Sequence, residues 1–482
     1  MQEEIDNFIY HLSLVKAMAF KIFNTLSRKK EVFEPLKKGE VTMYVCGPTV
    51  YDYPHIGNYR AYVFGDLLNR YLQYLEYKVK FVQNLTDVDD KTIRDSQKEG
   101  VSLKEYTEKF IRAFFEDLDT LNILRADVYP RATEHIKEMA VMTKTLLDKG
   151  FAYKSQDGCI YYSISKFKDY GKLAHLDPEQ LKEGASGRVL SDEYDKENVR
   201  DFALWKAWTP EDGDVFWETE VGKGRPGWHI ECSAMSMKYL GETFDIHGGG
   251  VDLIFPHHQN EIAQAEAATG KKFVNYWVHN EWLLVEGQKM SKSLGNFYVL
   301  RDILDKGYHP LAIRYLLMST HYRQQLNFTF KGLEAARNSL QRIWDFMKKL
   351  DEVNGTGDAL LVDKLINKAR NDFDDALNDD LEISKALAAV FEFIKGVNVA
   401  MGNLDKNDAA KIQEFMIDID RVFGFIVVKE EKISDDVQKM VDEREAARKA
   451  KDFKKADELR DKLKEMGIVL EDTPQGVRWK KA

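Results

Sequence analysis

The segment Tyr44-Val-Cys-Gly-Pro-Thr-Val-Tyr-Asp-Tyr-Pro-His-Ile-Gly-Asn58 has the pattern of a buried strand, a tight turn and the beginning of a helix. Residues 41–45 are mainly apolar, Gly47 interrupts the strand, and apolar residues recur at helical spacing over about 55–75. In an open α/β sheet such a crossing binds phosphates, because backbone N–H groups and the helix dipole point at the ligand. We therefore expect a parallel, Rossmann-type sheet with a nucleotide at this crossing.

A second motif, Lys289-Met-Ser-Lys-Ser293, places two lysines in a polar loop from which they could hold phosphates. The ordered pair of Pro54-His-Ile-Gly-Asn58 and this loop resembles the two signatures of class I aminoacyl-tRNA synthetases. Either motif alone is weak. The resemblance implies ATP binding by residues from both motifs: Pro54, His55, Gly57, Asn58, Lys289, Met290, Ser291, Lys292 and Ser293.

The composition indicates a globular protein of two or three domains. The chain has 482 residues, which exceeds one compact core. Its mean hydropathy is −0.46, its apolar runs are short and its first residues are acidic, so no membrane contact and no secretory signal are predicted. Three cysteines make no disulfide framework, which fits a reducing compartment. We expect a cytoplasmic protein.

The charge distribution points to the C-terminus as the nucleic-acid end. A formal charge of −10 argues against a basic surface over the whole protein. Residues 429–482 instead carry 15 basic and 14 acidic side chains, and the charged side chains within residues 473–482 are all basic. A local basic footprint for nucleic acid is therefore predicted there.

Changes of pattern divide the chain into six predicted segments. Short strands and turns between 129 and 226 indicate an insertion within the sheet, and the residues after about 300 have helical periodicity. The fold class is therefore α/β. The segments are an N-terminal extension (1–18), two halves of a Rossmann-type catalytic domain (19–128 and 227–300), the inserted region (129–226), a linker and α-helical bundle (301–428) and a small α+β module (429–482).

Two local predictions concern the second half of the sheet. Gly227-Trp-His-Ile-Glu-Cys232 has the texture of a strand, followed by a helix from Ser233. Phe244-Asp-Ile-His-Gly-Gly-Gly-Val-Asp252 predicts a strand that opens into a triple-glycine loop. Three glycines cost chain entropy, and close approach of the backbone to a ligand would compensate for it.

Four residues have the chemistry of a scattered metal site. Cys46 ends the first strand, Cys232 follows the later predicted strand, and His257 and Glu261 are four residues apart on one face of a helix that begins near Pro256. Two thiolates, an imidazole and a carboxylate are all ligands that zinc accepts. Each residue also has an ordinary structural explanation in a core, at a helix end or in solvent. Spacing alone favours those separate explanations.

Longer matches around these residues resemble the cysteinyl-tRNA synthetases, a family of class I enzymes. The matching stretches are Tyr44-Val-Cys-Gly-Pro-Thr-Val-Tyr51, Trp228-His-Ile-Glu-Cys232 and the segment from His247 to Glu261, and the resemblance extends over nearly the whole chain. It implies one zinc ion held by Cys46, Cys232, His257 and Glu261. It also implies a pocket for L-cysteine lined by Thr86, Trp228, His247 and Asp252.

The resemblance implies that ATP activates cysteine to an adenylate, from which the acyl group passes to the 3′ end of tRNA(Cys). Size alone in an apolar pocket separates cysteine from serine by only about 1–3 kcal/mol, whereas zinc prefers a thiolate strongly. Neither step needs a protein nucleophile, so positioning and charge stabilisation by His55, Lys289 and Lys292 are expected to carry catalysis. Mg²⁺ would accompany ATP through the phosphate oxygens.

The helical bundle and the terminal module resemble the anticodon-binding part of the same family. The resemblance implies that Arg448, Asp457 and Asp472 read anticodon bases, which polar side chains do on unstacked loops. The alternative is that Arg448 and Asp457 are ordinary charged residues on the exposed faces of helices and that Asp472 is a turn residue. A monomer is the default expectation.

Two other functions fit parts of the sequence. A ligase that transfers cysteine to an amino sugar would share the catalytic half but end without the terminal module, whereas residues 435–479 are present here. A catalytically inactive paralogue that binds RNA or another partner would have lost His55, Lys292 or a zinc ligand, and all of these are present.

Overall fold

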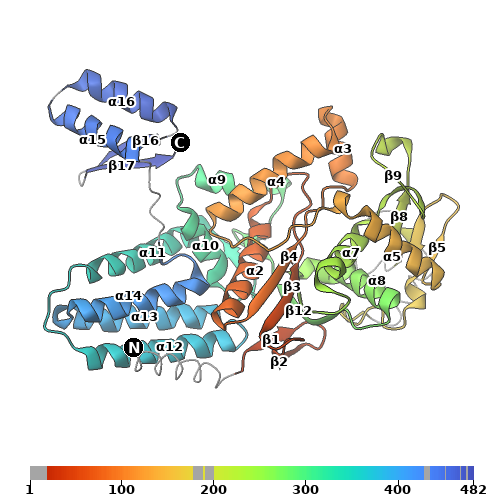
Figure 1. Cartoon of the computed structure of the whole chain (residues 1–482), viewed down its shortest axis with the longest axis horizontal. Coiled ribbons are helices and arrows are strands. Elements are labelled where there is room, and N and C mark those ends of the chain that lie inside the picture. Colours follow the sequence, from red (N-terminus) through yellow and green to blue (C-terminus); the bar gives the residue numbers. More distant parts are fainter. Residues whose placement is uncertain are drawn as a thin grey trace. The chain divides into compact units, whose positions relative to one another are not determined.

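The computed structural model describes residues 19–176, 188–189, 200–427, 435–450, 452–466, 468–473 and 476–481. The chain divides into two compact units, Met1–Val427 and Val428–Ala482 (Figure 1). The predicted extension, 1–18, lies outside the described residues, as does most of 177–199 within the predicted insertion.

The first unit is built on a four-stranded parallel sheet in the order β12-β11-β3-β4. Its strands are β3 (Glu40–Val45), β4 (Lys78–Gln83), β11 (Phe244–Gly250) and β12 (Val274–Asn280). The chain extends from β3 to one side and from β11 to the other, so the strand order reverses between these two neighbours. Open α/β sheets bind ligands at the carboxyl ends of strands beside such a reversal. The predicted α/β class with a parallel sheet is confirmed.

Helix α2 (Ile56–Tyr74) follows β3 and begins at the predicted nucleotide crossing. His55 caps it: Nδ1 of His55 accepts from the Asn58 backbone N–H at 3.3 Å, and Oδ1 of Asn58 accepts from the His55 N–H at 3.0 Å. A reciprocal cap of this kind satisfies two amide donors that the helix leaves open. It therefore fixes where the helix starts and leaves the remaining N-terminal amides at the crossing.

The insertion forms a separate sheet, in which β5-β6-β8-β10-β9 are antiparallel neighbours and β7 pairs parallel with β8. Ion pairs between buried basic side chains and the half-exposed Asp90 attach this sheet to helix α3 (Asp90–Glu99). Lys206 Nζ lies 3.0 Å from Asp90, and Arg225 bridges Asp90 and Asp212. The strands and the covering helix are β5 (Ala152–Lys154), β6 (Ile160–Tyr162), β7 (Arg188–Val189), β8 (Asp201–Ala207), β9 (Trp217–Thr219), β10 (Gly222–Pro226) and α5 (Ile136–Asp148).

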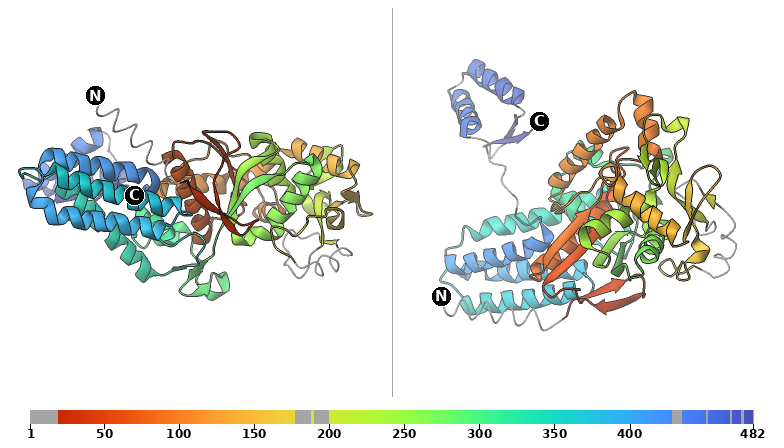
Figure 2. Two further views of the ribbon diagram at one scale, coloured as in Figure 1. Left: turned by 90° about the horizontal axis from the view of Figure 1, so that it is seen from below. Right: turned by 45° about the vertical axis from the view of Figure 1, so that its right-hand side comes forward.

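The bundle and the insertion lie on opposite sides of the parallel sheet (Figures 1 and 2). Buried charges join the bundle to α2, because Asp66 accepts from Arg70 at 2.8 Å and from Arg314 at 2.5 Å. No described helix has a stretch that is both long and apolar enough to cross a bilayer. The helices of the linker and bundle are α9 (Leu300–Leu304), α10 (Pro310–Ser319), α11 (Phe330–Leu350), α12 (Ala359–Asn378), α13 (Ile383–Ala400) and α14 (Lys406–Phe423).

Short elements complete the first unit. A hairpin precedes the sheet, one long helix follows α3, and a small three-stranded sheet in the order β14-β13-β15 carries the beginning of the lysine loop. These elements are β1 (Lys21–Asn24), β2 (Lys29–Val32), α4 (Leu103–Thr120), β13 (Leu283–Val285), β14 (Gln288–Lys289) and β15 (Leu326–Phe328).

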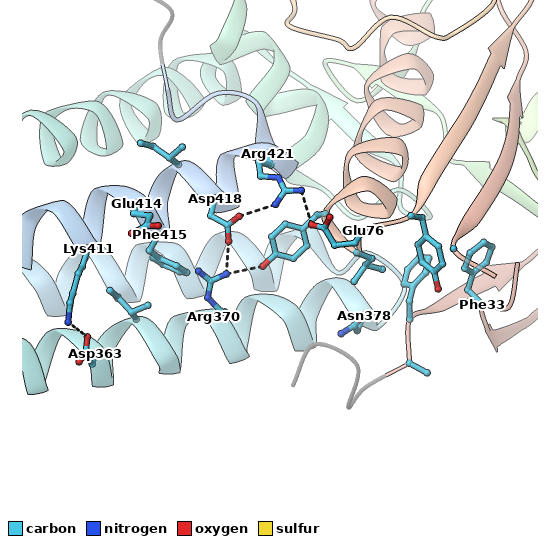
Figure 3. A pocket seen from close by; sticks show the side chains of 18 of the residues that line it. Phe33, Glu76, Asp363, Arg370, Asn378, Lys411, Glu414, Phe415, Asp418 and Arg421 are labelled. Carbon is cyan, nitrogen blue, oxygen red and sulfur yellow. Dashed lines mark hydrogen bonds and ion pairs between the residues drawn. The ribbon is translucent and has the colours of Figure 1, made fainter. Parts of the chain in front are cut away.

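A cavity of about 960 Å³ lies among α12, α14 and the end of α2 (Figure 3). Ion pairs cross one part of it: Asp418 lies 2.6 Å from Arg370 and 3.3 Å from Arg421, and Arg421 reaches Glu76 at 3.2 Å. None of the predicted site residues lines this cavity. It therefore belongs to the packing of the bundle on the sheet and not to the predicted chemistry.

The second unit is a small α+β module, as predicted for the terminal segment. Its helices α15 (Asp435–Lys449) and α16 (Phe453–Glu465) pack on each other, and β16 (Ile468–Thr473) pairs antiparallel with β17 (Gly476–Lys481). The core of this unit contains Val437, Val441, Leu463 and Ile468.

The predicted strand at Gly227–Cys232 is wrong. Helix α7 (Trp228–Leu240) begins directly after Gly227, so Cys232 lies in its second turn and does not follow a strand. The side chains of residues 229–236 are all buried. A short segment that is buried on every side has no polar face, and its sequence does not distinguish a helix from a strand.

The predicted triple-glycine loop is also wrong, because all three glycines belong to β11. Gly248 pairs with Val45 of β3 and with Val278 of β12. A Cβ atom at Gly249 would lie 2.9 Å from the ring of His258. Gly249 therefore belongs to a regular strand, and its lack of a side chain makes room for the buried ring of His258. The helix predicted from Pro256 is α8 (Gln259–Thr269), which follows a kinked π-helical turn, Ile254–His258, with extended backbone angles at Phe255.

One buried carboxyl in the bundle gives the fold a pH dependence. Asp374 of α12 accepts a hydrogen bond from the Tyr74 hydroxyl at 2.9 Å. Burial raises the pKa of Asp374 to about 6, although Tyr74 and Arg370 act in the opposite direction. Because this pKa is higher in the folded state, the stability that the carboxyl contributes is complete below its ordinary pKa and is lost as the pH rises through about 6.

We predict that Asp374→Asn stabilises the protein at pH 8 and does so less at pH 5. The amide keeps the acceptor for Tyr74 and carries no charge, so the gain at pH 8 is of order 1–3 kcal/mol. Thermal unfolding at both pH values measures it. Asp372→Asn on the same helix, at an exposed position, is the control. Equal effects of Asp374→Asn at the two pH values would contradict the assignment.

Candidate active site and metal centre

The four candidate metal ligands meet beside the reversal of strand order. One ligand atom from each of Cys46, Cys232, His257 and Glu261 lies within 4.8 Å of all the others. The two sulfur atoms are 3.9 Å apart, and Nε2 of His257 lies 3.1 Å from Oε1 of Glu261. No ligand is more than 9% exposed. The predicted constellation is therefore brought together from four separate elements.

Each ligand lies on a helix, directly after a strand or in the kinked turn before α8. Cys46 directly follows β3, and its N–H donates to the carbonyl of Gly248 on β11 at 3.3 Å. Cys232 lies on α7, and His257 and Glu261 lie on the π-helical turn and α8, which packs against α7. Ligands on rigid elements keep their geometry without rearrangement.

The donor set fits a zinc ion. Oε1 of Glu261 is buried and accepts no hydrogen bond within the described part of the chain, even though a ring nitrogen of His257 faces it. A buried acceptor without a donor calls for an explanation. A cation bound by both Glu261 and His257 would explain it. Two sulfur atoms, one imidazole nitrogen and one carboxylate oxygen match the ligand preferences of Zn²⁺.

The two thiols have different proton affinities. Burial raises the pKa of the Cys46 thiol well above its usual value, and the neighbouring Cys232 adds to the rise. Burial also raises the pKa of Cys232, but its hydrogen bond with Cys46 and the charge of His257 outweigh burial and bring it well below the usual value. Burial raises the pKa of Glu261. A divalent cation at this point would favour the deprotonated form of all three groups.

A second set of four residues shares two of these ligands. Cys46, His247, His258 and Glu261 also place ligand atoms within 4.8 Å of one another. Nε2 of His247 lies 2.9 Å from Oε2 of Glu261, and Nε2 of His258 lies 3.3 Å from the Cys46 sulfur. The sequence analysis did not predict a role for His258. The only feature of the sequence that could have indicated one is that His258 directly follows His257.

Three of the four residues predicted for the cysteine pocket contact this cluster or its neighbours. The Trp228 ring stacks on His257 at 4.3 Å between centroids, and His247 contacts Glu261. The Thr86 hydroxyl donates to Oε2 of Glu231 at 2.7 Å, a buried carboxylate that the sequence did not single out. Asp252 is exposed, in the turn that directly follows β11.

The two signature motifs are adjacent at the start of α2. The ring of Phe297 contacts the His55 ring at 5.5 Å and lies 4.9 Å from the Lys292 ammonium. Lys292 also pairs with Asp52 at 2.9 Å. A Cβ atom on Gly57 would come within 3.2 Å of the Met290 side chain, so this glycine permits the approach of the two segments.

The other residues predicted to bind the nucleotide lie in the same two segments of the chain. Pro54 directly precedes the capping His55, and burial lowers the pKa of that histidine, which favours the neutral form of its ring. Lys289 ends β14 and is exposed. The hydroxyl oxygen of Ser291 accepts from the Ser293 N–H at 3.3 Å, which shapes the turn that presents Lys292.

The three predicted anticodon residues all belong to the second unit. Arg448 and Asp457 are exposed on α15 and α16, and Asp457 lies 3.6 Å from Arg460 of the next turn. Asp472 is a residue of β16.

Residues 32–338 match the family model described as the tRNA synthetases class I (C) catalytic domain. Residues 372–427 match a DALR domain, and residues 430–479 match a cysteinyl-tRNA ligase anticodon binding domain. A cysteine–tRNA ligase of Brachyspira hyodysenteriae is 52% identical over 468 residues, which cover 95% of this chain and 98% of that protein. This chain belongs to the cysteine–tRNA ligase family. Another family member, from Protochlamydia amoebophila, is 50% identical and covers 97% of this chain and 99% of its own.

The fold of this cysteine–tRNA ligase family member is shared with other synthetases. A Mycobacterium tuberculosis methionyl-tRNA synthetase in complex with methionyl-adenylate aligns with a TM-score of 0.58 at 16% identity, over 80% of this chain and 89% of that chain. A putative arginyl-tRNA synthetase from Campylobacter jejuni aligns with a TM-score of 0.54, also at 16% identity, over 83% of this chain and 95% of that chain. The predicted family is confirmed. The match at 430–479 also argues against the amino-sugar ligase, which would lack that module.

The position of Cys46 depends on a close contact beside it. Gly47 donates its N–H to Oδ1 of Asn84 at 2.8 Å, and a Cβ atom on Gly47 would lie 1.8 Å from the Asn84 carbonyl oxygen. Any larger side chain must push the end of β3 away from the residues that follow β4.

We predict that Gly47→Ala lowers both stability and zinc content. Forcing an atom into a filled site costs about 1–3 kcal/mol, and the shift displaces Cys46 from the other ligands. Thermal unfolding and zinc per chain, measured by atomic emission, test this. Gly402→Ala is the control, because a Cβ atom there meets nothing within 4 Å. A Gly47→Ala protein with normal stability and zinc would refute the argument.

Proposed function

We propose that this chain activates L-cysteine with ATP and transfers it to the 3′ end of tRNA(Cys), and that a zinc ion selects the substrate by its thiolate. The observation that carries the proposal is the convergence of Cys46, Cys232, His257 and Glu261 within 4.8 Å, beside the nucleotide crossing of a class I fold. Membership of the cysteine–tRNA ligase family supports the overall reaction.

Zinc would supply a soft Lewis acid that a thiolate ligates in preference to a hydroxyl. Packing alone cannot make this distinction, because cysteine and serine differ by one atom and an apolar pocket separates such pairs by only about 1–3 kcal/mol. Trp228, Thr86, His247 and Asp252 would line the rest of the cysteine pocket. Glu231 would hold the Thr86 hydroxyl in one orientation through the 2.7 Å hydrogen bond.

In the first step the cysteine carboxylate attacks the α-phosphate of ATP, and pyrophosphate leaves. The amide groups at the start of α2 and the neutral ring of His55 would donate to the phosphates. Lys289 and Lys292 would neutralise charge that develops on the pyrophosphate. Lys292 would exchange its exposed ion pair with Asp52 for a phosphate, and the loss of such a surface pair costs little. Mg²⁺ would travel with the ATP.

In the second step a ribose hydroxyl at the 3′ end of tRNA takes the acyl group, and AMP leaves. Residues 19–128 and 227–300 would carry the chemistry, and 129–226 would be the insertion between them. Residues 301–428 and 429–482 would bind the anticodon arm, with Arg448, Asp457 and Asp472 at the bases. We further propose a cytoplasmic monomer.

We predict that pyrophosphate exchange with ATP requires cysteine and zinc together. Cysteine should support exchange, serine should not, removal of zinc with a chelator should abolish the activity, and added zinc should restore it. Cys232→Ser should lose zinc and exchange. Cys159→Ser is the matched control, because Cys159 is a buried thiol outside the cluster and its loss should leave both unchanged.

The outcomes separate two parts of the proposal. Undiminished exchange with cysteine after zinc removal would overturn selection by zinc and leave the ligase reaction standing. Absence of exchange in the zinc-loaded protein would overturn the reaction itself and favour the inactive paralogue.

A further inference from the structure

Tyr44 carries a buried hydroxyl for which the described part of the chain offers no hydrogen-bond partner of good geometry. The residue belongs to β3, two positions before Cys46, and is paired in register with His247 of β11. Its side chain is fully buried, and its ring contacts the His247 ring edge-on at 5.0 Å between centroids. The hydroxyl is therefore a donor in the immediate surroundings of the candidate metal ligands.

Three other buried tyrosines of the first unit do have partners. Tyr59 donates to Asp117 at 2.5 Å, Tyr71 to Asn378 at 2.8 Å, and Tyr322 to Asp380 at 2.5 Å. The fold thus normally satisfies a tyrosine hydroxyl that it buries. An unpaired buried donor costs free energy, and phenylalanine would fill almost the same volume without that cost. The oxygen of Tyr44 therefore calls for an acceptor that a bound ligand creates.

The acceptor that the geometry offers is the sulfur of Cys232. Tyr44, Cys46 and Cys232 pack in one buried cluster. Tyr44 and Cys46 are two residues apart and so share one face of β3, and α7, which carries Cys232, packs against this strand. A neutral thiol is a weak acceptor. A metal-bound thiolate carries negative charge and accepts a hydrogen bond much more strongly.

We propose that Tyr44 is a positioning residue of the metal centre, whose hydroxyl donates to the Cys232 sulfur when zinc is bound. The hydrogen bond holds this ligand in place and withdraws negative charge from its sulfur. Partners of this kind outside the ligand set tune metal affinity and electronics. An ion with less charge from its own sulfur ligands binds an additional thiolate more readily, which is what selection of cysteine requires. The inference rests on the proposed zinc site.

The test compares Tyr44→Phe with the wild type, and Tyr71→Phe serves as a matched control because it removes a buried hydroxyl far from the cluster. All three full-length proteins are loaded with Co²⁺ in place of zinc. In Tyr44→Phe the thiolate-to-cobalt absorption band should move to longer wavelength, because the sulfur electrons are no longer stabilised by the hydrogen bond. Zinc should also be lost to a competing chelator about 10–100-fold more readily. Tyr71→Phe should match the wild type in both.

A Tyr44→Phe protein with an unchanged band and unchanged zinc retention would overturn the inference and make Tyr44 a packing residue. Absence of any thiolate-to-cobalt band in the wild type would overturn the zinc site instead, so the two failures are distinguishable. If Tyr44→Phe does not fold, the near-ultraviolet difference spectrum of the wild type on zinc addition decides. A red shift of tyrosine absorption supports the new hydrogen bond, and no change contradicts it.

Discussion

Four ligating groups lie within 4.8 Å of one another in a buried site, and the two thiols and the carboxyl among them repel one another when deprotonated unless a cation lies between them. Much of the surrounding structure follows from this requirement. Gly47 allows the end of β3 to approach Asn84, Gly249 leaves room for the ring of His258, and α7 and α8 pack so that their ligands face Cys46. The cluster lies where the strand order of the parallel sheet reverses, which is also where α2 offers its N-terminus to a nucleotide. The proposed selection of the amino acid and the proposed binding of phosphate would thus share one edge of the sheet.

Helix α2 connects this edge to the rest of the first unit. Its first turn carries the His55 cap at the nucleotide crossing, and its third and fourth turns carry Asp66 and Arg70. Asp66 is buried against Arg70 and against Arg314 of α10. A buried carboxylate with two guanidinium partners loses much more than a surface pair when one partner is removed. The bundle is therefore fixed to the same helix that begins at the candidate nucleotide site.

The sequence was informative where function requires contiguous residues. The strand, turn and helix of 41–75 were predictable because apolar periodicity and a glycine break are local signals. The ligand set followed from the resemblance to a family and not from the spacing of the four residues. Prediction failed where burial is complete. Residues 229–232 belong to a helical segment that is buried on all sides, and Gly249 continues a strand at a point where any side chain would meet the ring of His258. Tyr44, Glu231 and His258 gain their roles only from neighbours that are distant in the sequence, so no local pattern identifies them.

The central claim is that a zinc ion held by two cysteines, a histidine and a glutamate receives the substrate sulfur directly. X-ray absorption at the zinc edge of the zinc-loaded protein tests this without reference to turnover. We predict two sulfur ligands, from Cys46 and Cys232, in the protein alone, and one more sulfur ligand after addition of cysteine but not of serine. A zinc ion whose sulfur coordination is the same with and without cysteine would contradict it.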